Sequence, residues 1–349
     1  MKRFLALLLS SFLVVIIAGY GLSVRAQSSS PATERFTPTP IAIPFNPATD
    51  SETYRPPDRE QSDLPFSDDS RAIIGRDQRV PVLSRSFPWS AIGRVDWAVD
   101  GEELGQCTGT LISPDVVLTN SHCLAPEEAN YQPIIPRGTE QNGRIQILFK
   151  PSLIEGVSTR TAMVIDYDYG WKSASEANPP DPADDWALLK LDQPLGNIYG
   201  YLGWRILDFT QPDVINQLNN QLRLAGYSGE FPTEQYRQFG AENETAGVHV
   251  GCSIQEVGQG IQLHNCDSMG GASGSTLIAL FEDGNYYIVG LHRGSVSSDE
   301  PNNFPPAYRE VCQVRRDENR QYVTTPACRN VSVEVSQWAT QAAAMRGSQ

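Results

Sequence analysis

The pattern of apolar residues after residue 72 limits the possible folds more than any other feature of the chain. From Ala72 onward, apolar residues occur in short runs that Gly, Pro, Asn and Asp interrupt, and few stretches have the spacing of an amphipathic helix. Short apolar runs bounded by turn residues are typical of β-strands, and a long series of them is typical of sandwiches and barrels. The sequence therefore predicts an all-β protein with room for two small barrels.

The amino terminus has the layout of an export signal. Lys2 and Arg3 precede an apolar run over residues 4–18, and the small residues expected at a cleavage site follow at Val24-Arg25-Ala26. The apolar run is shorter than the roughly 20 residues that span a bilayer, so we expect a cleaved signal peptide rather than an anchor. The prediction is a secreted or periplasmic protein with no stable membrane association after cleavage.

Residues 27–71 are rich in Pro, Ser and Thr, and their apolar residues are too scattered to form one face of a helix or a strand. Such a segment cannot offset its own ordering entropy, so it is predicted to be a pro-peptide or a disordered linker. Removal of a pro-peptide is expected near Arg71. The predicted order of parts is a signal peptide (1–26), a pro-peptide or linker (27–71), an amino-terminal β-barrel (72–205), a carboxy-terminal β-barrel (206–330), and a helix with a short tail (331–349).

The last part of the chain is predicted to be helical from Val331 to Met345. Val335, Trp338, Ala342 and Met345 recur at the spacing that places side chains on one face of a helix. We expect this face to pack against the protein.

The cysteines and the net charge exclude several classes of protein. All six cysteines lie after residue 100, and an even number in an exported chain favours disulfides over a metal site. The sequence has no Cys-x-x-Cys or His-x-x-x-His pattern, so we expect neither a metal nor a cofactor. The formal net charge of −14 argues against nucleic acid as a partner.

His122 follows a segment with the pattern of a β-hairpin. Two runs of strand-forming residues, 108–112 and 116–119, flank a proline turn, and His122 comes three residues after the second run. A histidine held at the exit of a rigid hairpin can serve as a general base, although a lone histidine is more often structural. From this pattern alone, His122 is either a structural histidine or a candidate base.

Two adjacent aspartates, Asp184 and Asp185, precede the mostly apolar run 186–191. An aspartate that enters the core with a strand needs a partner, because burial of an unpaired carboxylate is costly. A histidine that donates its Nδ1 proton is such a partner. Asp185 is the candidate, Asp184 is the reserve, and the alternative is a pair of ordinary solvated turn residues.

Ser273 lies in the run Gly-Gly-Ala-Ser-Gly-Ser, which covers residues 270–275. Glycines on both sides of the serine permit backbone conformations that other residues avoid, so the amides of Gly271 and Ser273 can point together at a developing oxyanion. An isolated run of this kind could equally be a flexible turn. The order His, Asp, Ser along the chain favours catalysis, and it differs from the α/β-hydrolases, in which the serine comes first.

These segments resemble the motifs of the trypsin-like serine proteases. Thr-Asn-Ser-His-Cys at 119–123 is similar to the Thr-Ala-Ala-His-Cys motif that carries the base of that family, and residues 185–189 are similar to its Asp-x-Ala-Leu-Leu signature. The resemblance implies a chymotrypsin-like double six-stranded antiparallel β-barrel, with Ser273 as nucleophile, His122 as base and Asp185 orienting the base. It also implies protein or peptide substrates and no cofactor, and we expect a monomer.

The resemblance supports one of three predicted disulfides, the one that closes the hairpin before His122. The other two are predicted from proximity along the chain and by elimination. The predicted pairs are Cys107 with Cys123, Cys252 with Cys266, and Cys312 with Cys328.

Three segments are similar to the bacterial glutamyl endopeptidase branch of this family. They are 73–79, Gly-Ala-Ser-Gly-Ser at 271–275, and Gly-Leu-His-Arg-Gly at 290–294. The similarity implies that His292 lies in the pocket for the substrate side chain on the amino side of the cut, where an imidazole can bind a carboxylate with help from Ser268. The remaining histidines, His249 and His264, are predicted to be structural.

Two residues complicate the prediction of substrate preference and of activation. Asp267 stands where trypsin has the aspartate that selects Arg and Lys, so a preference for basic residues is the alternative to a preference for Glu or Asp. Ala272 stands where trypsin has the aspartate that pairs with the new amino terminus, so activation by that ion pair is not expected. Two further alternatives are a protease-like protein that binds without cutting and an esterase that uses the same three residues.

Overall fold

The computed structural model describes part of the chain, and every statement below refers to this part. It describes residues 38–65, 77–135, 137, 145–175, 177–178, 180–295 and 329–347, and the backbone alone of 314–316 and 322–324. The chain divides into Met1–Arg35 and Phe36–Gln349, and all described residues belong to the second unit. The predicted signal peptide and the predicted pair Cys312–Cys328 lie outside the described residues. Among those residues, no helix has the length and apolar character needed to cross a membrane.

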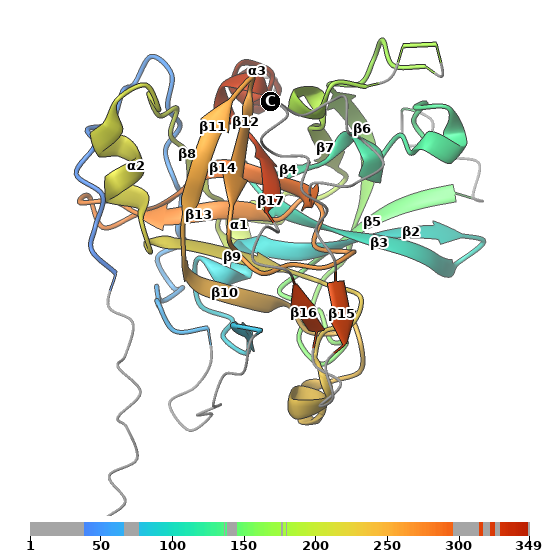
Figure 1. Cartoon of the computed structure of the whole chain (residues 1–349). Coiled ribbons are helices and arrows are strands. Elements are labelled where there is room, and N and C mark those ends of the chain that lie inside the picture. Colours follow the sequence, from blue (N-terminus) through green and yellow to red (C-terminus); the bar gives the residue numbers. More distant parts are fainter. Residues whose placement is uncertain are drawn as a thin grey trace, which may run out of the picture. The chain divides into compact units, whose positions relative to one another are not determined.

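The described unit is built mainly of β-strands (Figure 1), which confirms the all-β prediction. The strands are β1 (Arg79–Pro81), β2 (Ile92–Val99), β3 (Glu102–Leu111), β4 (Val116–Thr119), β5 (Ile145–Pro151), β6 (Ala162–Tyr169), β7 (Ala187–Leu191), β8 (Gly203–Trp204), β9 (Leu222–Gly226), β10 (Gly247–Cys252), β11 (Ile254–Gly258), β12 (Ile261–His264), β13 (Thr276–Leu280), β14 (Tyr286–Ser295), β15 (Val314–Arg316), β16 (Tyr322–Thr324) and β17 (Asn330–Val333). The α-helices are α1 (Gly196–Tyr199), α2 (Pro212–Leu218) and α3 (Ala339–Gly347).

The first sheet is a closed antiparallel barrel with the strand order β2-β3-β4-β7-β6-β5. Strand β4 is buried along its whole length and β7 nearly so, which explains the apolar runs Val-Val-Leu and Ala-Leu-Leu in these strands. The two strands pair antiparallel, with Thr119 opposite Ala187. The end of β4 therefore lies beside the start of β7, and this register brings the segment of His122 next to the segment of Asp185.

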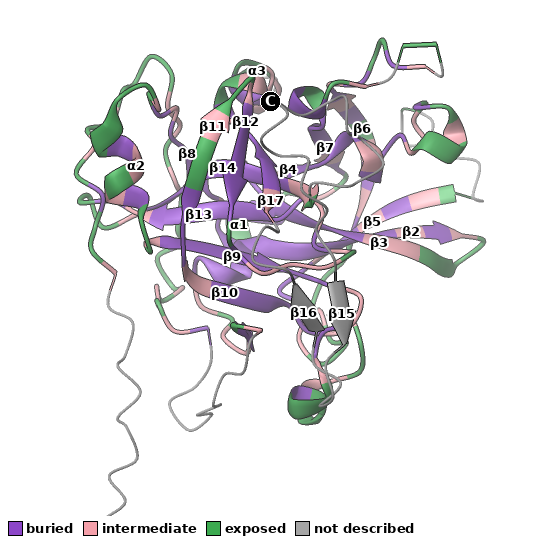
Figure 2. Ribbon diagram, viewed as in Figure 1, coloured by how far each residue is buried: buried purple, intermediate pink, exposed green. Residues whose placement is uncertain are grey.

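The second sheet has nine strands in the described residues and is open. Its order is β1-β10-β9-β13-β14-β17-β12-β11, and β8 pairs with β14. It differs from the closed six-stranded barrel that was predicted, although its central strands β9, β13 and β14 are buried like the interior of a barrel (Figure 2). Strand β1 pairs with β10 and so belongs to this sheet, although the predicted boundary assigned it to the first barrel.

The predicted helix over 331–345 starts too early. Residues Asn330–Val333 form β17, which pairs with both β12 and β14, and helix α3 begins only at Ala339. Val331 and Val333 are β-branched and fully buried between two strands, and this packing decides the local structure. The predicted packing face is nevertheless correct, because Val335, Trp338 and Ala342 are buried.

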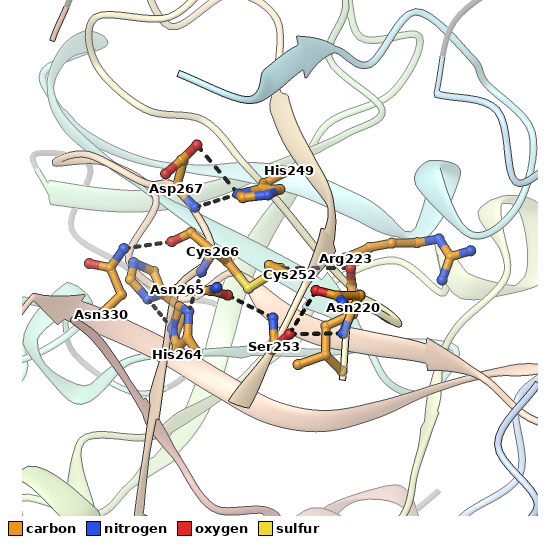
Figure 3. The surroundings of a disulfide bond; sticks show 12 residues. Asn220, Arg223, His249, Cys252, Ser253, His264, Asn265, Cys266, Asp267 and Asn330 are labelled. Carbon is orange, nitrogen blue, oxygen red and sulfur yellow. Dashed lines mark hydrogen bonds and ion pairs between the residues drawn. A yellow bond between two sulfur atoms is a disulfide. The ribbon is translucent and has the colours of Figure 1, made fainter. Parts of the chain in front are cut away.

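The structure contains two of the predicted disulfides. Cys107–Cys123 joins β3 to the short 3-10 helix Ser121–Cys123, and Cys252–Cys266 joins the end of β10 to the segment after β12 (Figure 3). The first bridge closes a loop of 16 residues directly at His122. A loop of that size constrains the unfolded chain by about 3 kcal/mol.

Residues 38–65, here called the strap, are ordered and lie along the second sheet (Figure 1). Ile41 is fully buried and exchanges backbone hydrogen bonds with Leu280 and Glu282. Asp50 is buried beside Arg205, with an Oδ2 to Nη1 distance of 3.4 Å. A disordered linker does not make such contacts, so within the segment 27–71 the strap behaves as part of the folded unit.

We expect the strap to stay bound when the chain is cut between residues 66 and 76. Burial of Ile41 is worth about 1.5–3 kcal/mol, and loss of Asp50 would leave the buried Arg205 with Asp283 as its remaining carboxylate partner among the described residues. Gel filtration of the cut protein followed by intact-mass spectrometry should recover both pieces together. The variant Ile41→Asp should release the strap and lower the melting temperature. A stable, active body recovered without the strap would contradict the expectation.

Candidate active site

His122 is held next to Asp185 by the residues that precede it. Asn120 donates from Nδ2 to the backbone carbonyl of Asp185 at 2.7 Å, and Ser121 donates from Oγ to the carbonyl of Trp186, also at 2.7 Å. Both contacts tie the exit of β4 to the entry of β7. The His122 ring remains 31 % exposed, so one of its faces is accessible to a substrate.

Asp185 is fully buried and accepts three hydrogen bonds with its carboxylate. Its Oδ1 accepts the backbone N–H of His122 at 3.1 Å, and its Oδ2 accepts His122 Nδ1 at 2.8 Å and Arg293 Nε at 3.1 Å. Burial by itself would raise the pKa of Asp185, but the charges and hydrogen bonds of His122 and Arg293 hold it below its usual value. Asp184, the reserve candidate, is exposed. Partial burial of its carboxyl group and the nearby charge of Asp181 raise its pKa.

Ser273 is half-buried and lies against the end of β14. The carbonyl of His292 accepts the amide of Gly274 at 2.9 Å, and Ser273 Oγ donates to the carbonyl of Arg293 at 3.3 Å. The first barrel also contacts this loop, because the amide of Thr108 donates to the carbonyl of Ser273 at 2.7 Å. The structure thus connects Ser273 to Asp185 through Arg293.

Both glycines beside Ser273 are required by the backbone. Gly271 and Gly274 have φ angles of +95° and +87°. A Cβ on Gly271 would lie 2.5 Å from the carbonyl oxygen of Tyr227, and one on Gly274 would lie 2.0 Å from that of Thr108. Within the described residues, the amides of Gly271 and Ser273 donate no hydrogen bond, so both are available to an oxyanion.

His292 and His264 form a buried pair. The amide of Cys266 donates to His264 Nδ1 at 3.2 Å, which leaves the proton of His264 on Nε2, and this atom lies 3.2 Å from His292 Nδ1. Nε2 of His292 is then the proton donor of that ring. Burial, reinforced by the charge of His122, lowers the pKa of His292 to about 3, so the ring is neutral near pH 7.

Asp267 accepts one hydrogen bond and lies beside a histidine. Its Oδ2 accepts the amide of Gln78 at 2.8 Å. The same atom lies 3.4 Å from His249 Nδ1, which itself accepts the amide of Asp267 at 2.8 Å (Figure 3). Burial raises the pKa of Asp267, although the charge of His249 acts in the opposite direction. Ser268, the predicted helper of His292, is half-buried in the same segment.

Two surface clefts lie beside segments of the candidate site, although His122, Asp185, Ser273 and His292 line neither of them. One has a volume of about 400 Å³ and is lined by residues that include Gln106, Gly270 and Gly271. The other has a volume of about 730 Å³ and is lined by residues that include Trp171 and Asp184. The Trp171 ring lies 6.2 Å from that of His122, and Gly271 carries one of the candidate oxyanion amides, so each cleft has a lining residue next to or within the candidate site.

Comparison with known proteins agrees with this arrangement. The family described as Trypsin matches residues 80–316, which is more than half of the chain. The chain belongs to the trypsin family. The match includes all of His122, Asp185 and Ser273.

Individual relatives of this trypsin-family chain are distant. A glutamyl endopeptidase of Bacillus licheniformis is 24 % identical over 161 residues, which is 46 % of this chain and 43 % of the relative. An extracellular metalloprotease of Bacillus subtilis is 25 % identical over 144 residues, which is 40 % of this chain and 41 % of the relative. The chain thus spans about two fifths of the length of these curated relatives.

A solved glutamyl endopeptidase in complex with MPD shares the fold. The match has a TM-score of 0.50 at 18 % identity and covers 80 % of this chain and all of the other. At this identity the match establishes a common fold, and the chemistry has to be argued from the residues.

Among the described residues, one group brings three potential metal-ligand atoms close together, but it does not form a metal site. This group is Cys107, His122 and Cys123. Both sulfurs are joined in a disulfide, and only a thiolate is an effective ligand.

Five contacts around the candidate site were not predicted from the sequence. Asn120 and Ser121 belong to the motif around His122, which could have signalled their role. Arg293 follows His292 directly, but no local pattern indicates that its side chain reaches Asp185. His249 and His264 were predicted to be structural, and each is indeed buried, yet each also contacts a predicted pocket residue.

Proposed function

We propose that this trypsin-family protein is a secreted serine endopeptidase in which Ser273 attacks, His122 is the general base and Asp185 orients it. The observation that carries the proposal is the buried hydrogen bond of 2.8 Å between His122 Nδ1 and Asp185 Oδ2. It fixes the tautomer of His122 so that Nε2 can take the proton of Ser273. The signal-like amino terminus and the two disulfides support export.

In the acylation step, Ser273 Oγ attacks the carbonyl carbon of the scissile peptide while its proton passes to His122 Nε2. This requires the hydroxyl to turn from the carbonyl of Arg293 toward His122. The carbonyl oxygen of the substrate becomes negative and accepts the amides of Gly271 and Ser273, a type of interaction worth about 3–4 kcal/mol per donor. The imidazolium then protonates the leaving amine, the C–N bond breaks, and the acyl-enzyme remains.

In the deacylation step, water repeats the sequence in place of the serine. His122 takes a proton from water, the hydroxide attacks the ester carbon, and the same two amides hold the oxyanion. The imidazolium returns its proton to Ser273 Oγ as the ester bond breaks. The negative charge of Asp185 stabilises the imidazolium in both steps and does not itself accept the proton.

We propose Glu or Asp as the preferred residue on the amino side of the cut. His292 supports this as a neutral proton donor with a fixed tautomer, since a hydrogen bond to a carboxylate does not require a protonated ring. Asp267 supports it as well, because its Oδ2 already accepts the amide of Gln78, which weakens its attraction for a basic substrate side chain.

The variant His292→Ala should reduce kcat/KM for substrates with Glu by roughly 10–150 fold, because it removes a hydrogen bond to a charged group worth about 1.5–3 kcal/mol. Cleavage after apolar residues should change little. The measurement is kcat/KM on peptides that differ only in the residue before the cut. Wild-type enzyme that cleaves after Arg and ignores Glu, and loses this preference in Asp267→Ala, would contradict the proposed specificity and leave the triad untouched.

Hydrolysis of casein and of a small ester tests the reaction class. An endopeptidase cuts casein at internal bonds, which mass spectrometry of the fragments identifies. Hydrolysis of the ester alone would indicate an esterase, and hydrolysis of neither would indicate a binding protein built on the protease fold.

A further inference from the structure

The peptide between Gly270 and Gly271 carries one of the two candidate oxyanion amides. This peptide is trans and therefore planar, so its carbonyl and its N–H point in opposite directions. The carbonyl of Gly270 accepts the amide of Gly229 at 2.7 Å. This hydrogen bond directs the carbonyl toward Gly229 and the N–H of Gly271 away from it.

The residues of this peptide do little to hold it in one orientation. Glycine adopts positive and negative φ with little penalty, so a peptide between two glycines turns over easily. Gly270 is exposed, a Cβ there would meet no atom within 4 Å, and Ala272 offers no polar side chain. In a peptide that had turned over, the Gly270 carbonyl would face the oxyanion and repel it. The orientation therefore depends on the turn that carries Gly229.

A buried arginine anchors this turn, which comprises residues 228–230. Arg79 is the first residue of β1, and its side chain is 3 % exposed. Its Nη1 donates to Ser228 Oγ at 2.9 Å, and its Nη2 donates to Glu230 Oε1. The planar guanidinium presents these donors in a fixed arrangement, so it restrains the residues on both sides of Gly229 together.

The same network contacts the loop of the oxyanion amides. Ser228 Oγ, which accepts Arg79, also accepts the amide of Met269 at 3.3 Å. Gln78 donates its amide to Asp267 Oδ2 at 2.8 Å. The start of β1 is thus joined to this loop both directly and through the turn 228–230.

We propose that Arg79 is a positioning residue that acts through the turn 228–230 and holds the Gly270–Gly271 peptide with its N–H aimed at the oxyanion. This inference rests on the proposed function, because the oxyanion forms only if Ser273 attacks a carbonyl carbon. Arg79 touches no reacting atom, and its effect is on the orientation of one peptide.

The test is Arg79→Met, which keeps a long side chain and removes the guanidinium. The oxyanion exists only in the transition state and the tetrahedral intermediate, so kcat should fall by roughly 10–100 fold while KM changes little. Every substrate forms the same oxyanion, so the loss should be equal for peptides with Glu and with an apolar residue before the cut. A loss that depends on this residue would place the effect in the side-chain pocket and contradict the proposal.

Arg205→Met is the matched control. The Arg205 side chain is also 3 % exposed, and it contacts two carboxylates, those of Asp50 and Asp283, as Arg79 contacts those of Asp77 and Glu230. Both substitutions should lower the melting temperature, but Arg205→Met should leave kcat near the wild-type value.

Ser228→Ala decides the question if Arg79→Met does not fold. It removes the oxygen that accepts both Arg79 and the Met269 amide, and it leaves Arg79 paired with its two carboxylates. The loss of kcat should be smaller, about threefold to tenfold, and again equal for all substrates. Wild-type kcat in Ser228→Ala would contradict the proposed route through the turn.

Hydrogen exchange separates this inference from the proposed function. NMR can follow exchange of the Gly229 amide in a Ser273→Ala background, which prevents self-digestion, with Gly229→Ala to assign the resonance. Arg79→Met, or Ser228→Ala in its place, should accelerate this exchange about tenfold beyond any effect of Arg205→Met, because the hydrogen bond to Gly270 opens more often.

An unchanged exchange rate of the Gly229 amide in the folded variant, or a kcat no lower than that of Arg205→Met, would overturn the proposal. A wild-type protein that hydrolyses no peptide would overturn the proposed function instead, and the exchange rate would still decide whether Arg79 holds the peptide.

Discussion

Ser273→Ala should abolish peptide hydrolysis, with a loss on the order of 10⁶-fold in kcat, and should leave the fold intact. The loss is large because the acyl-enzyme cannot form without the hydroxyl. The fold should survive because the Ser273 side chain is half-buried and its hydrogen bond to the Arg293 carbonyl is a long 3.3 Å. Steady-state kinetics and circular dichroism on the same sample would measure both outcomes.

Ser275→Ala is the matched control. Ser275 lies two residues away and is fully buried, and its Oγ has no hydrogen-bond partner among the described residues. Its removal should therefore cost neither stability nor turnover. The reverse pattern, with activity retained in Ser273→Ala and lost in Ser275→Ala, would transfer the role of nucleophile to Ser275.

Asp185→Asn should lower kcat by about 10⁴-fold while preserving the shape of the site. The amide would offer a donor to His122 Nδ1 and so favour the wrong tautomer of the base. It would also leave Arg293 without its buried counter-charge. The loss should not add to that of Ser273→Ala in the double variant, because the residues act as one unit.

Asp184→Asn makes the same chemical change at the neighbouring residue. Asp184 is exposed and contacts the site only through its backbone carbonyl, which accepts Ser121 Oγ at 3.2 Å. Little change in kcat is expected. Equal losses in both variants would mean that the negative charge of the loop, rather than the oriented carboxylate of Asp185, supports the reaction.

The candidate site was predictable where each residue stands in a short motif of its own. The hairpin before His122 and the apolar strand after Asp185 are both local patterns, and pairing of β4 with β7 follows once a barrel is assumed. Asp185 was chosen over Asp184 because residues 185–189 resemble the Asp-x-Ala-Leu-Leu signature, and in the structure Asp185 is buried and Asp184 is exposed.

The features that sequence patterns missed depend on contacts between distant residues. The last helix was predicted to begin at Val331, but residues 330–333 pair with β12 and β14 and so form a strand. The strap lacks any regular apolar face, yet Ile41 and Asp50 bind single sites on the second sheet. Arg293 reaches Asp185 across 108 residues of sequence, which no periodicity can indicate.

Covalent labelling with a fluorophosphonate, followed by peptide mapping, would identify the activated serine. The reagent modifies only a serine activated by a neighbouring base, so it reports the catalytic unit without knowledge of the natural substrate. One adduct is expected, on Ser273, that forms in the wild type and is lost in His122→Ala. An adduct on another serine, or no adduct on a folded wild-type protein, would contradict this assignment.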